Sequence, residues 1–193
     1  MPTEVTVRKL GSEDIRLIAL IDRSEHVDVE YTVAGGRLVT RPVTMTEIPP
    51  WDPAGSGPHS VAARVAFCAP IAAGGAAVPA SDGERLLGLA VVDGAFEPGL
   101  ARLAFLHVGG PHRRRGAASA LGDAAVEVAT ASGTEAMYVS ATPTGSAVGF
   151  YLSRDCALAD PVHPDLYARE PDDIHLVCRL GQSRPEASRG ERS

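Results

Sequence analysis

The sequence predicts an α/β fold in a single domain, from three observations. Short apolar runs of strand length alternate along the chain with longer segments of helical period. Residues 103–131 join the two kinds in one stretch: an apolar run at 103–108, a Gly-Gly-Pro break at 109–111, and a helical pattern that begins at Arg115 and stops at Gly133. At 193 residues, with 45% hydrophobic and 22% charged side chains, the chain has the length and composition of one domain with a sizeable core.

The other expected elements combine a period of two or of 3.6 residues with capping or turn residues at their ends. Ser12 is a suitable N-cap for the first helix, and Gly74 ends the second. A Gly-Gly turn at 34–36 and a Ser-Asp-Gly turn at 81–83 each separate two β-prone runs, which predicts two hairpins. In chain order the expected elements are a strand at 5–10, a helix from Ser12 to about Asp22, a hairpin of 27–33 with 37–45, a helix at 61–73, a hairpin of 76–79 with 85–93, the strand and helix of 103–131, a strand at 135–141, a short helix at 146–154 and a strand at 173–180.

Two segments lack a regular period. Residues 48–58 are too rich in proline and glycine to form a helix or strand, and a long loop in a compact domain is commonly functional. Trp51, the only tryptophan, lies in this loop, either as an anchor packed on the core or as a wall of a substrate site. Residues 181–193 are polar and are expected to form a disordered tail, which places the domain at residues 1–180.

Composition and cysteine usage argue against several classes of function. The 24 Asp and Glu residues outnumber the 18 Lys and Arg residues, which argues against nucleic-acid binding. No apolar segment is long enough to span a bilayer and the first ten residues do not resemble a signal peptide, so no membrane partner is expected. The three cysteines, Cys68, Cys156 and Cys178, lack metal-binding spacing. We expect them to be reduced thiols in a cytoplasmic protein without a metal site.

The turn after the 103–108 run has the composition of an anion site. Three arginines precede three small residues there: Arg113, Arg114, Arg115, Gly116, Ala117 and Ala118. The small side chains leave the backbone N–H groups at the start of the helix accessible, and the helix dipole favours a negative charge in front of them, as in a pyrophosphate site. A solvated basic turn, a nuclear-type basic patch and simple close packing of helix on sheet are the alternatives. We favour phosphate contact because the arginines and the small residues occur together.

Two blocks of the sequence resemble the GCN5-related N-acetyltransferase (GNAT) family. The pattern Val108-x-x-Pro111-x-Arg113-x-x-Gly116-x-Ala118 is similar to the acetyl-CoA signature of that family, Arg/Gln-x-x-Gly-x-Gly/Ala. After one expected strand, Thr144-Gly-Ser-Ala-Val-Gly-Phe-Tyr151 resembles the family's short helix that ends in Phe-Tyr. With the closing strand, the resemblance covers about residues 84–180. It implies a mixed, twisted sheet flanked by helices.

The same resemblance implies an acetyl-CoA-dependent N-acetyltransferase in which an amine attacks the thioester directly in a ternary complex. The coenzyme pyrophosphate would lie on the arginine turn. The main chain of Leu106, His107 and Val108 would pair with the pantetheine arm, and an N–H there would polarise the acetyl carbonyl. Tyr151 would donate a proton to the departing thiolate, to which a phenol is suited. The alternatives are a non-catalytic acyl-CoA-binding or sensing module and a structural domain.

The sequence says least about the base and the acceptor. Arg102 and Ala104 occupy the strand face on which some GNAT members carry a carboxylate. The acidic segment at residues 22–30 offers Glu25 and Glu30 as catalytic candidates and hints at a cationic small-molecule acceptor, such as an aminoglycoside-like compound or a polyamine; the alternative is a solvated helix end. A peptide amine as acceptor and a homodimer remain open. The other candidates for the base are a water chain, His26, Asp173 and His175.

Overall fold

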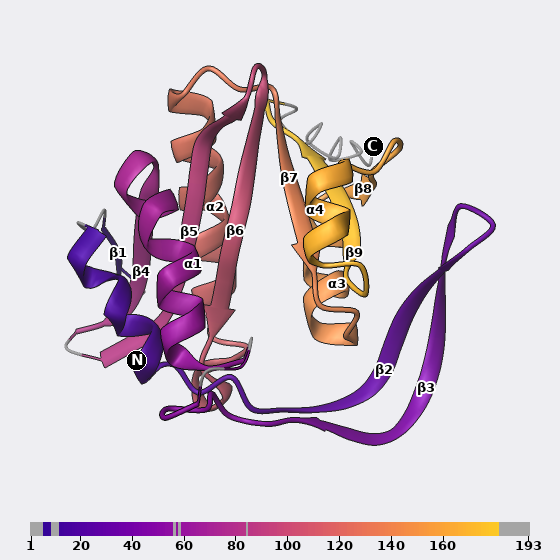
Figure 1. The fold of residues 1–193 in the computed structure, drawn as a ribbon, viewed down its shortest axis with the longest axis horizontal. Helices are drawn as coiled ribbons and strands as arrows, with labels where there is room; N and C mark the ends of the chain where they lie inside the picture. Colours follow the sequence, from indigo (N-terminus) through magenta and orange to yellow (C-terminus); the bar gives the residue numbers. More distant parts are fainter. Residues whose placement is uncertain (1–5, 9–11, 56, 58, 84, 182–193) are drawn as a thin grey trace, which may run out of the picture.

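The computed structural model describes residues 6–8, 12–55, 57, 59–83 and 85–181. A seven-stranded sheet has the order β1-β4-β5-β6-β7-β9-β8, and β2 and β3 form a separate two-stranded sheet (Figure 1). The strands are β1 (Thr6–Val7), β2 (Glu25–Ala34), β3 (Arg37–Ile48), β4 (Ala76–Asp82), β5 (Arg85–Glu97), β6 (Leu100–Val108), β7 (Ala136–Ala141), β8 (Ala157–Leu158) and β9 (Ile174–Arg179). The helices are η1 (Ser12–Leu20), α1 (Val61–Gly74), η2 (Gly110–His112), α2 (Ala117–Ala131), α3 (Gly145–Leu152) and α4 (Pro164–Arg169), of which η1 and η2 are 3-10 helices.

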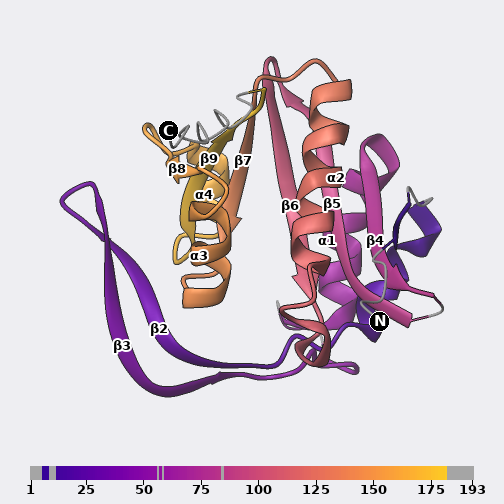
Figure 2. The ribbon, with the colours of Figure 1, turned by 180° about the vertical axis from the view of Figure 1, so that it is seen from behind.

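The predicted mixed sheet flanked by helices is confirmed. Strands β6 and β7 run parallel, whereas the other neighbouring pairs of the large sheet run antiparallel. Helices η1 and α1 cover one face, and α2 covers the other (Figures 1 and 2). The parallel pair needs a crossover connection, which α2 supplies.

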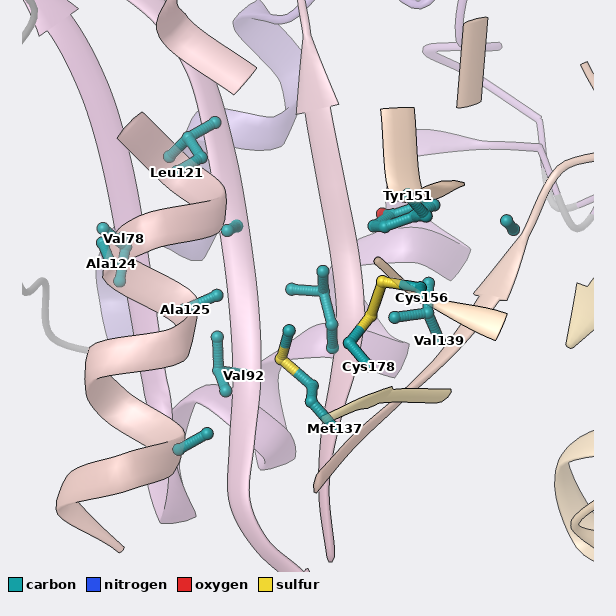
Figure 3. Close-up of a cluster of buried hydrophobic side chains, with 14 of the residues drawn as sticks. Val78, Val92, Leu121, Ala124, Ala125, Met137, Val139, Tyr151, Cys156 and Cys178 are labelled. Atoms are coloured by element: carbon teal, nitrogen blue, oxygen red, sulfur yellow. A yellow bond between two sulfur atoms is a disulfide. The ribbon is translucent and has the colours of Figure 1, made fainter. Parts of the chain in front are cut away.

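The core lies in two layers, one on each face of the sheet. Figure 3 shows the layer under α2, where Leu121, Ala124 and Ala125 lie over the sheet near Val92 of β5. On the other face, Ile18 of η1 belongs to a cluster with residues of α1 and β5. Strand β5 contributes to both layers, so it reads as a continuous apolar run rather than an alternating one.

Strands β6 and β7 are paired only at their first residues. Their register runs from Leu100 opposite Ala136 to Leu103 opposite Val139 and then stops. On its other side, β6 pairs Phe105 with Val91 and Leu103 with Val92, so Ala104 is an extra residue without a partner in β5. Such a bulge bends a strand and increases its twist. It lies where the pairing with β7 ends, so the two strands diverge beyond it (Figure 1).

The hairpin of β2 and β3 passes below the open end between β6 and β7 and then extends beyond α3 (Figures 1 and 2). The Tyr31 N–H donates to the Pro143 carbonyl at 2.8 Å, and Glu30 forms a β-bridge with Thr144. Strand β2 is thereby attached to the loop that follows β7. The sequence predicted this hairpin but not its position in the molecule.

Several local expectations differ from the structure. The first helix is a 3-10 helix that ends at Leu20, where the Asp22 carboxylate accepts the Ser24 N–H at 2.9 Å and closes a turn. The short elements β8 and α4 were missed, because two residues of strand and six of helix carry too little periodicity. The expected strand at 5–10 is described only at 6–8, and the expected tail lies almost wholly outside the described residues.

The expectation of three reduced thiols is wrong for two of them. Cys156 and Cys178 form a disulfide whose Cα atoms are 4.1 Å apart. Ala157 pairs with Val177 in the antiparallel ladder of β8 and β9, so the two cysteines are opposite each other one position further along. Only this pairing brings them together. Cys68 is free and buried, and burial raises its pKa to about 12. No described helix is long and apolar enough to cross a bilayer.

We expect reduction of this disulfide to lower the free energy of unfolding. Closure of a loop of this size, with a sequence separation of 22 between the cysteines, contributes about 3 kcal/mol. For a domain of this length the melting temperature should fall by about 6–12 °C. Thermal melts with and without dithiothreitol measure the shift. Cys68→Ala should show the same shift, because Cys68 is not part of the disulfide. A Cys156→Ala/Cys178→Ala variant should not respond to dithiothreitol. Equal melting temperatures of the wild type in both conditions would contradict the assignment.

Candidate active site

A cleft of about 2170 Å³ opens where β6 and β7 diverge. The end of β6, the turn after it and the starts of α2 and α3 line one part of it. The remainder is lined by the start of β2, the Trp51 loop, α1 and residues 169–173. Segments from most of the chain therefore meet at this point.

The edge of β6 directs backbone groups toward the cleft. The Gly109 N–H donates to the Leu87 carbonyl at 2.9 Å, so residue 109 faces β5. Because residues of an antiparallel ladder face their partner strand alternately, Leu106 and Val108 direct their N–H and C=O groups away from β5, toward the opening. His107 directs its own groups toward β5. Of the three residues predicted to contact the coenzyme through their backbone, Leu106 and Val108 direct these groups toward the opening, whereas His107 does not.

The turn before α2 leaves the start of that helix uncovered. Helix α2 begins at Ala117 rather than at Arg115, because Arg114 (φ 61°) and Gly116 (φ 85°) are left-handed. Gly116 is the N-cap, has no side chain to cap the helix, and would have nothing within 4 Å of an added Cβ. The first N–H groups of the helix therefore have no partner within it. Gly116, Ala118 and Ser119 line the cleft.

The three arginines of the turn differ in position. Arg114 and Arg115 are exposed, and Arg114 lines the cleft. The guanidinium of Arg113 turns inward, where Nε donates to the Val108 carbonyl at 3.3 Å and Nη1 pairs with the Glu25 carboxylate at 3.1 Å. Its Nη2 donates to the Ser24 carbonyl at 3.4 Å. The side chain of Arg113 therefore joins the end of β6 to the start of β2.

The two glutamates predicted as catalytic candidates are both engaged. Besides its ion pair with Arg113, Glu25 accepts a hydrogen bond from the Ser146 hydroxyl, so it joins the turn to the start of α3. Glu30 pairs with Arg41 across the hairpin at 2.7 Å and is not among the residues that line the cleft. Glu30 therefore lies in the hairpin, outside the cleft lining, whereas Glu25 lies in the lining and joins the turn to α3.

Tyr151, in α3, lines the cleft beside Phe150. Its side chain is 8% exposed, and burial raises the pKa of the phenol well above its usual value. The phenol is therefore neutral at ordinary pH and holds a proton that it can donate. Asp173 lies close enough for its charge to raise the same pKa further.

Asp173, in the loop before β9, also lines the cleft. Burial is the main cause that raises its pKa to about 6, and the charge of Glu170 adds to it, whereas Arg64 opposes it. A carboxylate with this pKa is ionised at pH 7 but binds a proton more readily than an ordinary aspartate. The sequence named Asp173 only as one of several candidates for the base.

Trp51 both packs on the core and faces the cleft. Its ring lies 6.3 Å from that of Phe105 and 6.4 Å from that of His107, measured between centroids, and the indole lines the cleft. Burial lowers the pKa of His107 to about 4, so its ring is neutral at pH 7. Trp51 is therefore both packed on the core and part of the cleft wall, so the two predicted alternatives do not exclude each other.

Two arginines of this wall, Arg23 and Arg64, are not among the residues predicted from the sequence. Arg64 is the only charged residue of α1, whose sequence is otherwise apolar, and this was a signal that could have singled it out. No group of three or more His, Cys, Asp or Glu side chains that could hold a metal ion occurs in the described part of the chain.

Comparison with known proteins identifies this architecture. The chain resembles the crystal structure of nourseothricin acetyltransferase at a TM-score of 0.65 and 18% identity, over 92% of this chain and 99% of the other. A protein of Bacillus anthracis assigned as a streptothricin acetyltransferase, solved with acetyl coenzyme A, gives a TM-score of 0.66 at 11% identity, over 92% and 99% of the two chains. The ribosomal-protein-S18-alanine N-acetyltransferase of Escherichia coli gives 0.57 at 12%, over 95% and 98%.

These structural likenesses show a common fold. No curated protein matches the chain in sequence. The model of the acetyltransferase (GNAT) family matches residues 45–156, which is more than half of the chain and includes the bulged strand, the turn and α3. The chain belongs to the GNAT family of acetyltransferases.

Proposed function

We propose that the protein transfers an acetyl group from acetyl-CoA to a primary amine by direct attack in a ternary complex. The observation that carries the proposal is the line of free backbone donors along the cleft. These donors run from Leu106 and Val108 at the edge of β6 to the uncapped start of α2 at Gly116.

Each set of donors suits one part of the co-substrate. The N–H groups at the start of α2 would bind the pyrophosphate, with Arg114 adding positive charge. The free edge of β6 would pair with the amide groups of the pantetheine arm, as an added strand does. One N–H of this edge would polarise the thioester carbonyl, which stabilises the charge that develops on its oxygen.

Asp173 and Tyr151 would move the two protons of the reaction. Asp173 would take a proton from the acceptor ammonium, which frees the lone pair that forms the new N–C bond. As the C–S bond breaks, Tyr151 would give its proton to the sulfur, and the second proton that the attacking nitrogen loses would pass to the Tyr151 oxygen and restore the phenol. This proposal replaces Glu30 by Asp173 as the base and leaves Glu25 to hold the turn and α3 in place.

The test is amine-dependent release of the coenzyme thiol. The protein is incubated with acetyl-CoA and a panel of amines, thiol release is followed with a chromogenic reagent, and the acetylated product is detected by mass spectrometry. We expect release above the background rate with at least one amine. Tight binding of acetyl-CoA without release for any amine would favour the non-catalytic module.

Gly116→Leu is expected to abolish acetyl-CoA binding. A side chain there would cover the N–H groups of α2, and loss of two charge-assisted hydrogen bonds weakens binding by about 100-fold or more. Gly133→Leu is a matched control, because Gly133 also has a positive φ (76°) and open space around its Cβ but lies at the far end of α2. Both variants carry similar backbone strain. In calorimetric titrations only Gly116→Leu should lose acetyl-CoA binding. Equal affinities of the two variants for acetyl-CoA would contradict a pyrophosphate site at the start of α2.

A further inference from the structure

Two arginines face the cleft on the side opposite α2. The guanidinium carbon of Arg23 lies 4.6 Å from the ring centroid of Trp51, and that of Arg64 lies 5.8 Å from the same centroid. Both residues line the cleft. The charge of Arg64 helps to lower the pKa of Arg23, and both arginines help to lower that of His59, after the larger effect of burial in each case. Two like charges are thus held side by side in a partly buried position.

Neither guanidinium has an anionic partner among the residues that the structure describes. The arginines that form ion pairs there are Arg41, Arg113 and Arg154, each with a carboxylate within 4.0 Å. In contrast, Nη1 of Arg23 and Nε of Arg64 are buried and have no hydrogen-bond partner. Stacking on Trp51 stabilises a cation but satisfies none of its N–H groups. A buried, unsatisfied polar group destabilises the fold, and more so when it is charged.

A ligand carboxylate in the cleft would supply the anionic partner that both guanidiniums lack. Guanidinium donors match carboxylate oxygens in geometry, and two guanidiniums around one carboxylate also remove the repulsion between them. The neighbouring titratable groups leave room for this role. His59 and His107 both have lowered pKa values, so at pH 7 neither adds a charge to this wall. Asp173, in the same cleft lining, is close enough to both Arg64 and Tyr151 for their charges to interact.

The acidic segment at residues 22–30, which suggested a cationic acceptor, does not face the cleft as a row of free carboxylates. Asp22 accepts the Ser24 N–H, Glu25 pairs with Arg113, and Glu30 pairs with Arg41. Three of its four carboxylates therefore have partners within the protein. Arg23 and Arg64, in contrast, form no ion pair with a described carboxylate, so this part of the cleft wall argues for an acceptor with a negative group.

We propose that the acceptor is an amino carboxylic acid, whose carboxylate binds between Arg23 and Arg64 while its amine faces Asp173. This inference rests on the proposed acetyl transfer, which supplies the role of Asp173, but the arginine pair is an independent feature of the cleft. An amino acid and its N-acetyl product share the carboxylate. Both should therefore bind here, whereas an amino acid amide or a polyamine lacks the group that the arginines recognise.

Binding can be measured without catalysis. Trp51 is the only tryptophan and contacts Arg23, so its fluorescence reports on this wall. The protein is titrated with N-acetylated forms of the common amino acids and with the matching N-acetyl amino acid amides. We expect at least one acid to bind about tenfold more tightly than its amide, because the amide loses charge-assisted hydrogen bonds.

Arg23→Gln and Arg64→Gln should each weaken binding of that acid by about 10- to 100-fold, with the amide and acetyl-CoA unaffected. Arg23→Lys and Arg64→Lys should restore part of it. Arg41→Gln is the control, because Arg41 is outside the cleft lining and already paired. Thermal melts verify that each variant is folded. Equal binding of acid and amide, no fluorescence response to any acid, or unchanged affinity in both Gln variants would each overturn the inference.

The acetylation assay separates this inference from the proposed function. Thiol release with polyamines or amino acid amides at rates equal to those with the free amino acids would overturn the carboxylate site and leave acetyl transfer intact. Selective binding of acids in the fluorescence titration, without thiol release for any amine, would instead remove the proposed function and retain the carboxylate site. Release with amino acids that is lost in Arg64→Gln at low acceptor concentration and recovered at high concentration would support both.

Discussion

Tyr151→Phe is expected to lower turnover by about 100-fold or more while acetyl-CoA affinity stays unchanged. General acid catalysis typically contributes about 10²–10⁴-fold, and the phenol is the proton donor that we propose for the thiolate. The substitution removes only the hydroxyl, and Tyr151 is otherwise buried in the core beside Phe150, so packing should persist. Because burial raises the phenol pKa, the wild type keeps its proton donor throughout the pH range of the assay.

Tyr138→Phe is the matched control for this experiment. Tyr138 is also buried, but it lies outside the cleft lining, and its oxygen accepts the backbone N–H of His163 at 3.1 Å. It should lose stability by about 1 kcal/mol and keep its turnover. Pre-steady-state kinetics identify whether chemistry limits the rate. If Tyr151→Phe turns over like the wild type when chemistry is limiting, Tyr151 is a core aromatic and a different group or water protonates the thiolate.

The parts of the site that the sequence predicted are local in the chain. The strand, the turn and the start of α2 occupy consecutive residues, and their glycine and alanine positions can be recognised without knowing the fold. Even there, the bulge at Ala104 and the left-handed Arg114 carry no clear signal, because neither residue type is typical of that conformation. The helix start was consequently placed two residues too early.

The parts that the sequence could not predict come together only through the topology. Arg23 follows η1, Arg64 lies in α1 and Asp173 precedes β9, and no periodicity relates three residues so far apart. The same holds for the disulfide, since Cys156 and Cys178 meet only because β8 and β9 pair in one register. Glu25 and Glu30 were selected for their charge, but their partners Arg113 and Arg41 also depend on strand positions.

Asp173→Asn is expected to lower turnover by about 100- to 10,000-fold, the range of a general base, and to change the pH profile in a defined direction. In the wild type, turnover should fall as the pH decreases through about 6, because the carboxylate becomes protonated there. This acidic limb should be absent in the variant. Asp172→Asn is the control: Asp172 is exposed, and its charge raises the Asp173 pKa. That variant should keep its turnover and move the limb to slightly lower pH.

The stability of Asp173→Asn should change in the opposite direction to its turnover. The pKa of Asp173 is higher in the folded protein than the ordinary value of 3.8, so the folded state binds the proton more tightly than the unfolded chain. Ionised Asp173 therefore destabilises the fold at pH 7, and this cost disappears as the pH falls from about 6 toward 4. Asp173→Asn should melt at a higher temperature than the wild type at pH 8, and the difference should vanish near pH 4. A variant that is slower but more stable at pH 8 assigns Asp173 to catalysis, whereas unchanged turnover with an unchanged acidic limb would leave the base to a water chain.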